Sequence, residues 1–453
     1  MSWLQQSYQS LNTPLQGSLW PVVPTREAAL ALSLLQQMEF AERLAPGTLA
    51  LQQSVQLSQL VRHAAKTVPF YARRLGAVPS SPQEFSDYWN SVPILSRDEL
   101  QVAGEKVLSQ SPPRGHKLLG TRSTSGSTGM PVKVYTSNVG RLFWMVNTVR
   151  AYLWQGWDLN KKLASIRPEL ESGIGKGVRA GSWGKSSSLI TRTGPGVALS
   201  VRTPISEQIE WLKNERPDYL LSLPTNLRAL REAGADLSSL QGVQTYGELL
   251  DDNTKEFVEA GMPWRLFDGY SSQEVGYITL QCEKHSHHVI SDCVLLEVVD
   301  DNGQPCAPGE TGRVVVTTLQ NLVAPLIRYA IGDYAVLGQA CSCGRSLPVV
   351  GRILGRKRNM IKLPDGSSHW PSFPYKDWAE GIAIKQFQLV QSRLDAIEVK
   401  IVAAETITTE QEKQMRLGLQ ARLGFPFEIG FSYVEHIPRS KGGKYEDFVS
   451  LVV

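Results

Sequence analysis

The amino-acid sequence predicts an α/β fold with a large N-terminal domain of several subdomains and a small α+β C-terminal domain. Short apolar runs alternate with helical patterns in the middle of the chain, as in 219–223 and 225–233, which is typical of α/β layers. A strong turn at 363–366 opens a last stretch with its own helix and strand patterns. We therefore expect an N-terminal body at 1–355 and a C-terminal domain at 356–453.

Hydrophobic spacing predicts the individual elements in chain order. Apolar residues recur at helical spacing over 27–44 and 51–65, which predicts two packing helices. Ser96, shortly before Glu99, is a helix N-cap signal. From Cys282 onward the pattern favours β structure. The strands expected there are 294–299, then 312–316 after a turn at 301–303, and 396–402 in the C-terminal domain.

Composition excludes several classes of protein. The 453 residues contain 47 Lys and Arg against 43 Asp and Glu, a net charge of +4, which does not indicate a nucleic-acid partner. No apolar run reaches the ~18 residues of a membrane span, and the start shows no export signal, so we expect a cytoplasmic protein. Five cysteines are too few for a disulfide framework. A homodimer is compatible with this composition.

One segment is unusually rich in hydroxyl groups and glycines. It consists of Ser123, Thr124, Ser125, Gly126, Ser127, Thr128 and Gly129, with Lys133 shortly after. Glycines let backbone N–H groups approach phosphate oxygens, hydroxyls add donors, and a lysine adds charge, although the spacing is not that of a P-loop. A flexible linker is the alternative, but the segment runs directly into a strand-like stretch at 132–135, which favours phosphate binding.

This segment resembles the phosphate loop of the adenylate-forming ligases, the superfamily of acyl-CoA synthetases, luciferases and non-ribosomal peptide adenylation domains. Further motifs resemble that superfamily in the same order along the chain: 246–250, 268–274, 326–333, 355–362 and 438–444. The resemblance implies the adenylate-forming type of N-terminal domain and a mobile C-terminal domain that carries the catalytic lysine.

Within the superfamily, the chain resembles the phenylacetate-CoA ligase-like family, including its branch associated with capsule biosynthesis. The segments that carry this resemblance are 68–71, 93–96, 288–292 and 341–345. It implies an ATP- and Mg²⁺-dependent enzyme that converts a carboxylic acid, aryl or otherwise apolar, to acyl-AMP and then to a CoA thioester. Candidate walls of the acid pocket lie at 143–154 and 181–184.

The resemblance also implies roles for individual residues. These are Gly247 and Glu248 beside adenine, Tyr270 stacked on adenine, Glu274 on Mg²⁺, Asp333 on the ribose hydroxyls, Arg356 on phosphate or ribose, and Lys444 between the substrate carboxylate and the α-phosphate. Each has a plainer alternative. Tyr270 is also a candidate core aromatic, Glu274 a carboxylate at a helix start, and Asp333 a turn residue or a salt-bridge partner of Arg328. Lys444 also fits a solvated basic turn.

Two departures from the family pattern leave the second half-reaction open. Gln273 stands where Thr or Ser is usual, and Asn359 stands at the hinge position that is usually Asp. An adenylate-forming enzyme that passes the acyl group to an amine or to a carrier-protein thiol, instead of CoA, is therefore the main rival. A non-catalytic nucleotide-binding scaffold is disfavoured, because the motifs keep Glu274, Asp333 and Lys444.

The cysteines and histidines suggest a structural metal site. One Cys₃His set for Zn²⁺ can be drawn from Cys282, His288, Cys341 and Cys343. The two pairs flank the predicted β region, so a hairpin or meander could bring them together. His285 and His287 leave the nitrogen ligand open, and thiols without a metal are the alternative. No Ser-His-Asp or Cys-His-Asn pattern indicates hydrolase chemistry.

Overall fold

The computed structural model describes two compact units. The described residues are 11–17, 20–123, 132–168, 170, 175–356, 359–369, 371, 378–438 and 446–452. Unit 1 comprises Met1–Ile331 and Ala335–Ile353, and unit 2 comprises Gly332–Tyr334 and Leu354–Val453. Both contain helices and sheets, so the predicted α/β class with a smaller α+β C-terminal part is confirmed.

Unit 1 begins with a group of helices. They are α2 (Arg26–Ala41), α3 (Pro46–Thr67), α4 (Pro69–Arg74), α5 (Pro82–Ser91) and α6 (Arg97–Ala103), followed by the 3₁₀ turn η2 (Gly104–Val107). The hydroxyl of Thr25 accepts the N–H of Ala28 at the start of α2. Ser96 and Glu99 form a reciprocal capping box at α6. The helices predicted at 27–44 and 51–65 and the cap at Ser96 are confirmed.

A twelve-stranded sheet forms the body of unit 1. In sheet order its strands are β11 (Val294–Val299), β12 (Thr311–Thr318), β13 (Tyr329–Leu337), β14 (Val349–Arg356), β10 (His287–Val289), β9 (Gly276–Gln281), β8 (Leu266–Ser272), β7 (Gly242–Tyr246), β6 (Tyr219–Ser222), β3 (Leu163–Arg167), β5 (Gly196–Ser200) and β4 (Val178–Ala180). A separate hairpin joins β1 (Leu118–Ser123) to β2 (Lys133–Ser137). The predicted strands at 219–223, 294–299 and 312–316 are confirmed.

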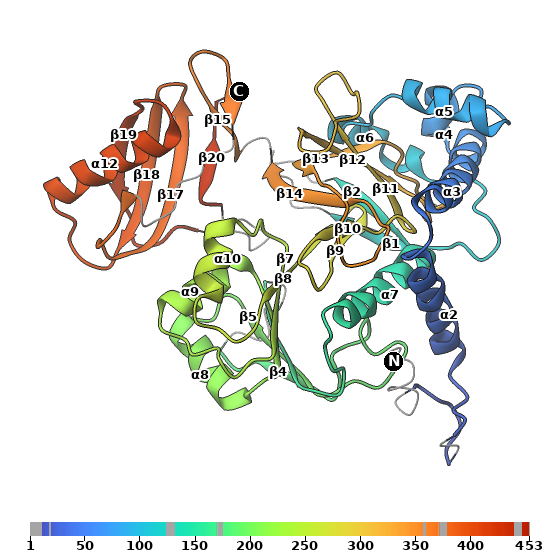
Figure 1. Ribbon diagram of the computed structural model, residues 1–453, viewed down its shortest axis with the longest axis horizontal. Coiled ribbons are helices and arrows are strands. Elements are labelled where there is room, and N and C mark those ends of the chain that lie inside the picture. Colours follow the sequence, from blue (N-terminus) through green and yellow to red (C-terminus); the bar gives the residue numbers. More distant parts are fainter. Residues whose placement is uncertain are drawn as a thin grey trace. The chain divides into compact units, whose positions relative to one another are not determined.

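Five neighbouring strands, β5, β3, β6, β7 and β8, run parallel. Helices α8 (Ile205–Glu215), α9 (Pro224–Glu232) and α10 (Asp252–Glu259) lie in the connections and cover one face of these strands (Figure 1). Because the strands are parallel, their carboxyl ends meet at one edge, which is where ligands bind in such sheets.

The opposite face of the parallel strands packs on aromatic side chains and on α7 (Asn138–Trp154). The ring of Trp157 stacks between Tyr219, at 4.4 Å, and Tyr152, at 5.1 Å. Gly242 opens β7 directly beneath this stack, and a Cβ there would lie 2.6 Å from Nε1 of Trp157. A larger residue at this position would therefore push the indole away from the sheet.

Unit 2 contains a four-stranded sheet in the order β19 (Glu428–Tyr433), β18 (Ala396–Ala403), β17 (Ile384–Arg393) and β20 (Phe448–Ser450). Helix α12 (Thr409–Leu423) shares an apolar core with this sheet. A two-stranded sheet of β15 (Ile361–Lys362) and β16 (Ser368–His369) surrounds the turn predicted at 363–366. The strand predicted at 396–402 is confirmed as β18.

A buried charge network connects distant segments of unit 1. Glu42, at the C-terminus of α2, accepts hydrogen bonds from Arg150 at 2.9 Å, from Trp154 at 3.0 Å and from Arg345 at 2.9 Å. Arg150 also pairs with Asp292 at 2.9 Å. The side chains of Arg150 and Glu42 are only 1% and 3% exposed. Water therefore cannot stabilise these two charges, and each is stabilised mainly by its partners in the network.

Among the described residues, no helix is long and apolar enough to cross a membrane.

Replacing Arg150 with Met should strongly destabilise unit 1. The substitution removes the guanidinium that pairs with Asp292 and leaves Glu42, a buried carboxylate, with Arg345 as its remaining cationic partner. We expect a loss of about 3–5 kcal/mol in the free energy of unfolding, measured by urea titration with tryptophan fluorescence.

The matched control is Arg228→Met, which removes a more exposed helix pair with Glu232. It should cost less than about 1 kcal/mol. Equal losses in the two variants would contradict the importance assigned to the buried network.

Candidate functional site

The predicted adenine-contacting segments meet at the carboxyl edge of the parallel strands. Tyr246, the last residue of β7, lies opposite Gly269 of β8, so Gly247 and Glu248 follow one strand end while Tyr270 lies on its neighbour. Gly247 adopts φ +77°, which a residue with a side chain rarely takes. A carboxylate oxygen of Glu248 accepts from the backbone and hydroxyl of Thr225, at 3.2 and 2.7 Å.

Glu274, predicted to bind Mg²⁺, lies in the turn between β8 and β9. The alternative of a helix start is therefore wrong. Its carboxylate pairs with Arg97 of α6 at 3.1 Å, with side-chain exposures of 7% and 18%. No local pattern predicts this pair, because the two residues are 177 positions apart.

Asp333 and Arg356, both in unit 2, form an ion pair at 2.8 Å. The alternative partner of Asp333, Arg328, is wrong. Its guanidinium pairs with Glu297 at 3.1 Å and donates to the carbonyl of Val92 at 2.6 Å. Because Arg328 is buried, Glu297 supplies the countercharge it needs within unit 1.

The ends of the predicted phosphate loop lie in the β1–β2 hairpin, where Ser123 and Lys133 face each other in register. Lys133 is exposed. The residues between them, Thr124, Ser125, Gly126, Ser127, Thr128 and Gly129, lie outside the described residues, as does Lys444.

Asn359, the departure at the predicted hinge, has a structural role. Its side-chain amide donates to the carbonyl of Phe448 in β20 at 2.9 Å. An aspartate carboxylate has no N–H to donate, so this contact explains why an amide suits the position.

The structure brings together the four residues predicted to bind Zn²⁺. One donor atom from each of Cys282, His288, Cys341 and Cys343 lies within 4.8 Å of the others. The Sγ atoms of Cys282 and Cys341 are 3.8 Å apart, which is too long for a disulfide. A tetrahedral zinc with ~2.3 Å Zn–S bonds separates its sulfurs by about 3.8 Å.

The contacts of His288 leave its Nε2 as the nitrogen that could bind a metal. Its Nδ1 lies 3.1 Å from the carbonyl of Leu347, to which it can donate, and its Nε2 lies 3.3 Å from Sγ of Cys343. Burial lowers the pKa of His288, which favours the neutral ring that binds metals. His285 and His287 lie outside the set, so of these three histidines His288 is the one that the structure brings to the three cysteines.

Asp268 and His287 form a separate buried polar group below Tyr270. Asp268 accepts from the hydroxyl of Thr245 at 2.6 Å, and burial raises the pKa of its carboxyl to about 6. His287 lies 3.9 Å from Asp268, but burial lowers its pKa to about 3. The imidazole is therefore neutral at physiological pH, and the contact is not an ion pair.

Most of the predicted acid-pocket walls are core. Tyr152, Trp154 and Trp183 are buried. Trp144 differs, because it is 37% exposed and stacks on Tyr277 with ring centres 4.5 Å apart. Among the predicted aromatic wall residues, Trp144 thus remains the clearest candidate for contact with a ligand.

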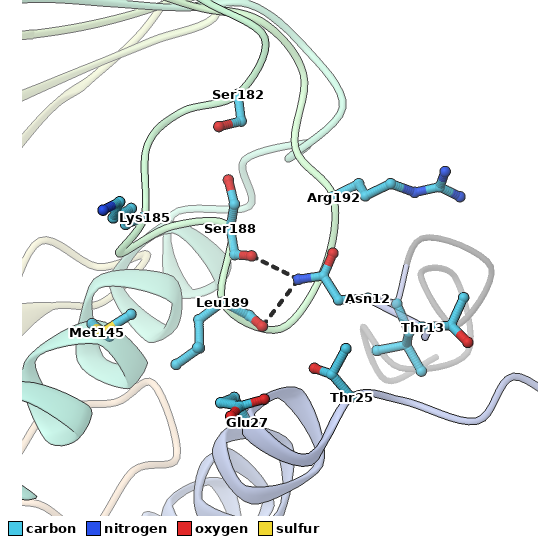
Figure 2. Close-up of a pocket in the computed structure, with 11 residues that line it drawn as sticks. Asn12, Thr13, Thr25, Glu27, Met145, Ser182, Lys185, Ser188, Leu189 and Arg192 are labelled. Atoms are coloured by element: carbon cyan, nitrogen blue, oxygen red, sulfur yellow. Dashed lines mark hydrogen bonds between the residues drawn. The ribbon is translucent and has the colours of Figure 1, made fainter. Parts of the chain in front are cut away.

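A cavity of about 650 Å³ lies between the segment 11–13, the start of α2 and the loop 182–192. Figure 2 shows Asn12 donating across one side of it to the carbonyls of Ser188 and Leu189, at 2.7 and 3.0 Å. Met145 and Ser182, from the segments predicted as acid-pocket walls, line this cavity, whereas none of the described residues predicted to bind nucleotide or metal does.

Comparisons with known proteins match two parts of the chain to family models. Residues 189–322 match the AMP-binding enzyme family. Residues 375–450 match the CapK C-terminal domain.

Two curated relatives extend the similarity over most of the chain. The phenylacetate-coenzyme A ligase of Thermus thermophilus is 26% identical over 444 residues, which cover 88% of this chain and 96% of the relative. That of Escherichia coli is 24% identical over 417 residues, covering 86% and 92%.

Solved structures share the fold. A 2-hydroxyisobutyryl-CoA ligase in the postadenylation state, in complex with R3-HIB-AMP, superimposes with a TM-score of 0.71 at 18% identity, covering 90% of this chain and 91% of that one. The complex of 2-hydroxyisobutyryl-CoA ligase with 2-HIB-AMP and CoA in the thioesterification state gives 0.57 at 18% identity, covering 90% and 91%. Together with the ordered motifs, these comparisons identify an AMP-binding enzyme segment at 189–322 and a CapK C-terminal domain at 375–450, and they support a relation of the chain to the adenylate-forming phenylacetate-CoA ligases, to which it is similar over most of its length.

Proposed function

We propose that the chain is an ATP-dependent, AMP-forming carboxylate–CoA ligase. It activates a carboxylic acid as acyl-AMP and then transfers the acyl group to CoA. The observation that carries this proposal is the meeting of the 247–248 segment and Tyr270 at the ends of two neighbouring parallel strands. The similarity to two phenylacetate-coenzyme A ligases along most of their length supports the same reaction.

The first half-reaction joins two anions. A carboxylate oxygen of the acid attacks the α-phosphorus of ATP, and the bond to pyrophosphate breaks, so the protein must offset repulsion and align the reactants. Mg²⁺, held by Glu274 in this proposal, supplies positive charge at the phosphates. Arg97 already pairs with this carboxylate, so it can hold the Glu274 side chain in one orientation before the metal binds.

In this proposal, the other predicted site residues contact different parts of ATP. We assign the phosphates to the segment 123–129 and Lys133, adenine to Gly247, Glu248 and Tyr270, the ribose to Asp333, phosphate or ribose to Arg356, and the developing charge at the α-phosphate to Lys444. In the second half-reaction the CoA thiolate attacks the acyl carbon, and the bond to AMP breaks.

An amine or a carrier-protein thiol is the rival acceptor. The altered hinge was the main reason to consider it, and the hydrogen bond from Asn359 to Phe448 gives that alteration a structural explanation instead. CoA is therefore the acceptor we favour. A cytoplasmic location and a homodimer remain predictions from the sequence.

We also propose that the Cys₃His cluster binds one structural Zn²⁺. Its donor set and the 3.8 Å sulfur separation support this metal. The ion would connect the turn between β9 and β10 to the loop that holds Cys341 and Cys343. This role is structural, because all four cluster donors are protein side chains and a tetrahedral ion would have no open position.

The proposed reaction is tested by incubating the protein with ATP, Mg²⁺ and a panel of carboxylic acids. We expect acid-dependent pyrophosphate release, trapping of the acyl group by hydroxylamine, and a thioester when CoA is added. Amide formation with added amines but no thioester would contradict the CoA assignment. No release with any acid, from a folded protein that binds no ATP, would contradict adenylation itself.

Lys444→Ala should separate the two half-reactions. Loss of a charge that stabilises the first transition state should lower the adenylation rate at least ~100-fold, or about 3 kcal/mol. Thioester formation from supplied acyl-AMP should change little. The exposed Lys413→Ala in α12 is the control, and equal losses of both half-reactions in Lys444→Ala would argue against the assigned role.

Zinc content can be measured directly in the purified protein by mass spectrometry. We expect about one Zn²⁺ per chain, and less than about a tenth of that in Cys343→Ala, because a closed structural site needs all four ligands. Cys306→Ala removes a buried thiol outside the cluster and should keep the metal. A metal-free wild-type protein, purified from zinc-supplemented cells, would refute the site.

A further inference from the structure

The short strand β10 carries two histidines that serve different groups. His287 and His288 are consecutive, so their side chains point to opposite faces of the sheet. On one face His288 belongs to the Cys₃His cluster, with its ring nitrogens 3.1 Å from the carbonyl of Leu347 and 3.3 Å from Sγ of Cys343. Strands β9 and β14 pair with β10 on its two edges. The backbone that carries His287 is therefore held on both edges and on one face.

Hydrogen bonds determine which nitrogen of the His287 ring carries the proton. The side-chain oxygen of Gln281 accepts the backbone N–H of Asp268 at 2.7 Å, so the amide nitrogen of Gln281 is the atom that lies 2.9 Å from Nε2 of His287. An amide nitrogen can only donate, so Nε2 accepts and the proton of the ring lies on Nδ1. Nδ1 donates to the hydroxyl oxygen of Thr279 at 2.9 Å.

The two partners of His287 are the residues of β9 that face the strand of Tyr270. Thr279 lies directly opposite Tyr270 in the β8–β9 pairing, and opposite residues point to the same face of a sheet. Gln281 contacts Asp268, which lies two residues before Tyr270 and so points to that face as well. His287 thus joins the two side chains that lie against β8 on the face of Tyr270.

The same polar group extends to β7, the strand that leads into Gly247. The carboxylate of Asp268 accepts the hydroxyl of Thr245 at 2.6 Å, and Thr245 comes two residues before Gly247. Thr245 and Thr279 have no exposed surface, and Gln281 is 7% exposed. Because water cannot replace a lost partner here, the geometry of the group depends on each of its hydrogen bonds.

We propose that His287 is a positioning residue of the nucleotide site. Through Thr279 and Gln281 it fixes the part of β8 that carries Tyr270, so that the phenol ring is oriented to stack on adenine. An apolar side chain would leave the Gln281 amide and the Thr279 hydroxyl unpaired, and both would shift to find other partners. This inference rests on the proposed function, which assigns Tyr270 to adenine. His287 acts through Tyr270 and does not itself contact the nucleotide.

Ligand binding to the full chain separates this role from a general loss of structure. Calorimetry gives dissociation constants for AMP, which contains adenine, and for pyrophosphate with Mg²⁺, which does not. His287→Leu should weaken AMP binding about 10-fold and leave pyrophosphate within about twofold, because only stacking on Tyr270 is impaired. His287→Asn should recover part of the loss, since its amide nitrogen can replace Nδ1 as the donor to Thr279.

A double-mutant cycle tests whether His287 acts through Tyr270. In the Tyr270→Ala background, His287→Leu should change AMP binding by less than about twofold, because the ring that it positions is already absent. Losses that multiply in the double variant would overturn the inference. An equal loss of AMP and pyrophosphate binding in His287→Leu would overturn it as well.

Thr279→Val reaches the same hydrogen bond without changing β10, so it decides the matter even if His287→Leu does not fold. The valine keeps the shape of the side chain and removes the acceptor of Nδ1, which should weaken AMP binding about threefold and leave pyrophosphate unchanged. Thr67→Val is the matched control, because it removes another threonine hydroxyl that contacts a histidine, His63, in α3. It should change neither ligand.

The outcomes distinguish this inference from the proposed function. If the wild-type protein binds no AMP, or if Tyr270→Ala binds AMP as tightly as the wild type, the assignment of Tyr270 to adenine fails and this inference fails with it. AMP binding that depends on Tyr270 but is unchanged in His287→Leu and Thr279→Val would overturn this inference alone.

Discussion

The buried carboxylate of Glu42 is the interaction on which unit 1 depends most. It joins the end of α2 to Arg150 and Trp154 of α7 and to Arg345, which is 303 residues away in sequence. Three hydrogen bonds from the protein replace the water that would otherwise surround the Glu42 carboxylate. These bonds form only if the helix or loop that carries each donor is correctly positioned. The network therefore fixes α7, which carries Trp144 to the sheet edge. Through Arg345 it also fixes the loop of the Cys₃His cluster, because the guanidinium lies 4.1 Å from the centre of the Trp154 ring.

The residues that we propose to contact adenine lie where the parallel strands end, and the packing of the sheet explains this position. The faces of these strands are covered by helices and by the Trp157 stack, so the carboxyl edge is where polar side chains can gather without losing solvation or a partner. Tyr270 and Glu248 use that edge for the nucleotide in our proposal.

Local patterns in the sequence predicted much of the fold. Helical spacing gave α2 and α3, and the capping residues around Ser96 gave the start of α6. The Cys₃His set could be named because each pair of ligands is close in sequence, although only the sheet order, which places β14 beside β10, brings the pairs together. Pairs between distant residues left no such signal. The partners of Glu274 and Arg328 depend on which strands and helices become neighbours, so hydrophobic period and motif order could not predict them.

The central claim is that the carboxyl edge of β7 and β8 holds the nucleotide part of an acyl-adenylate. A crystal structure with a non-hydrolysable analogue, an acyl sulfamoyl adenosine, tests it most directly. We expect adenine to lie against Tyr270 and the 247–248 segment. An analogue bound elsewhere, for example in the cavity of Figure 2, would contradict the claim.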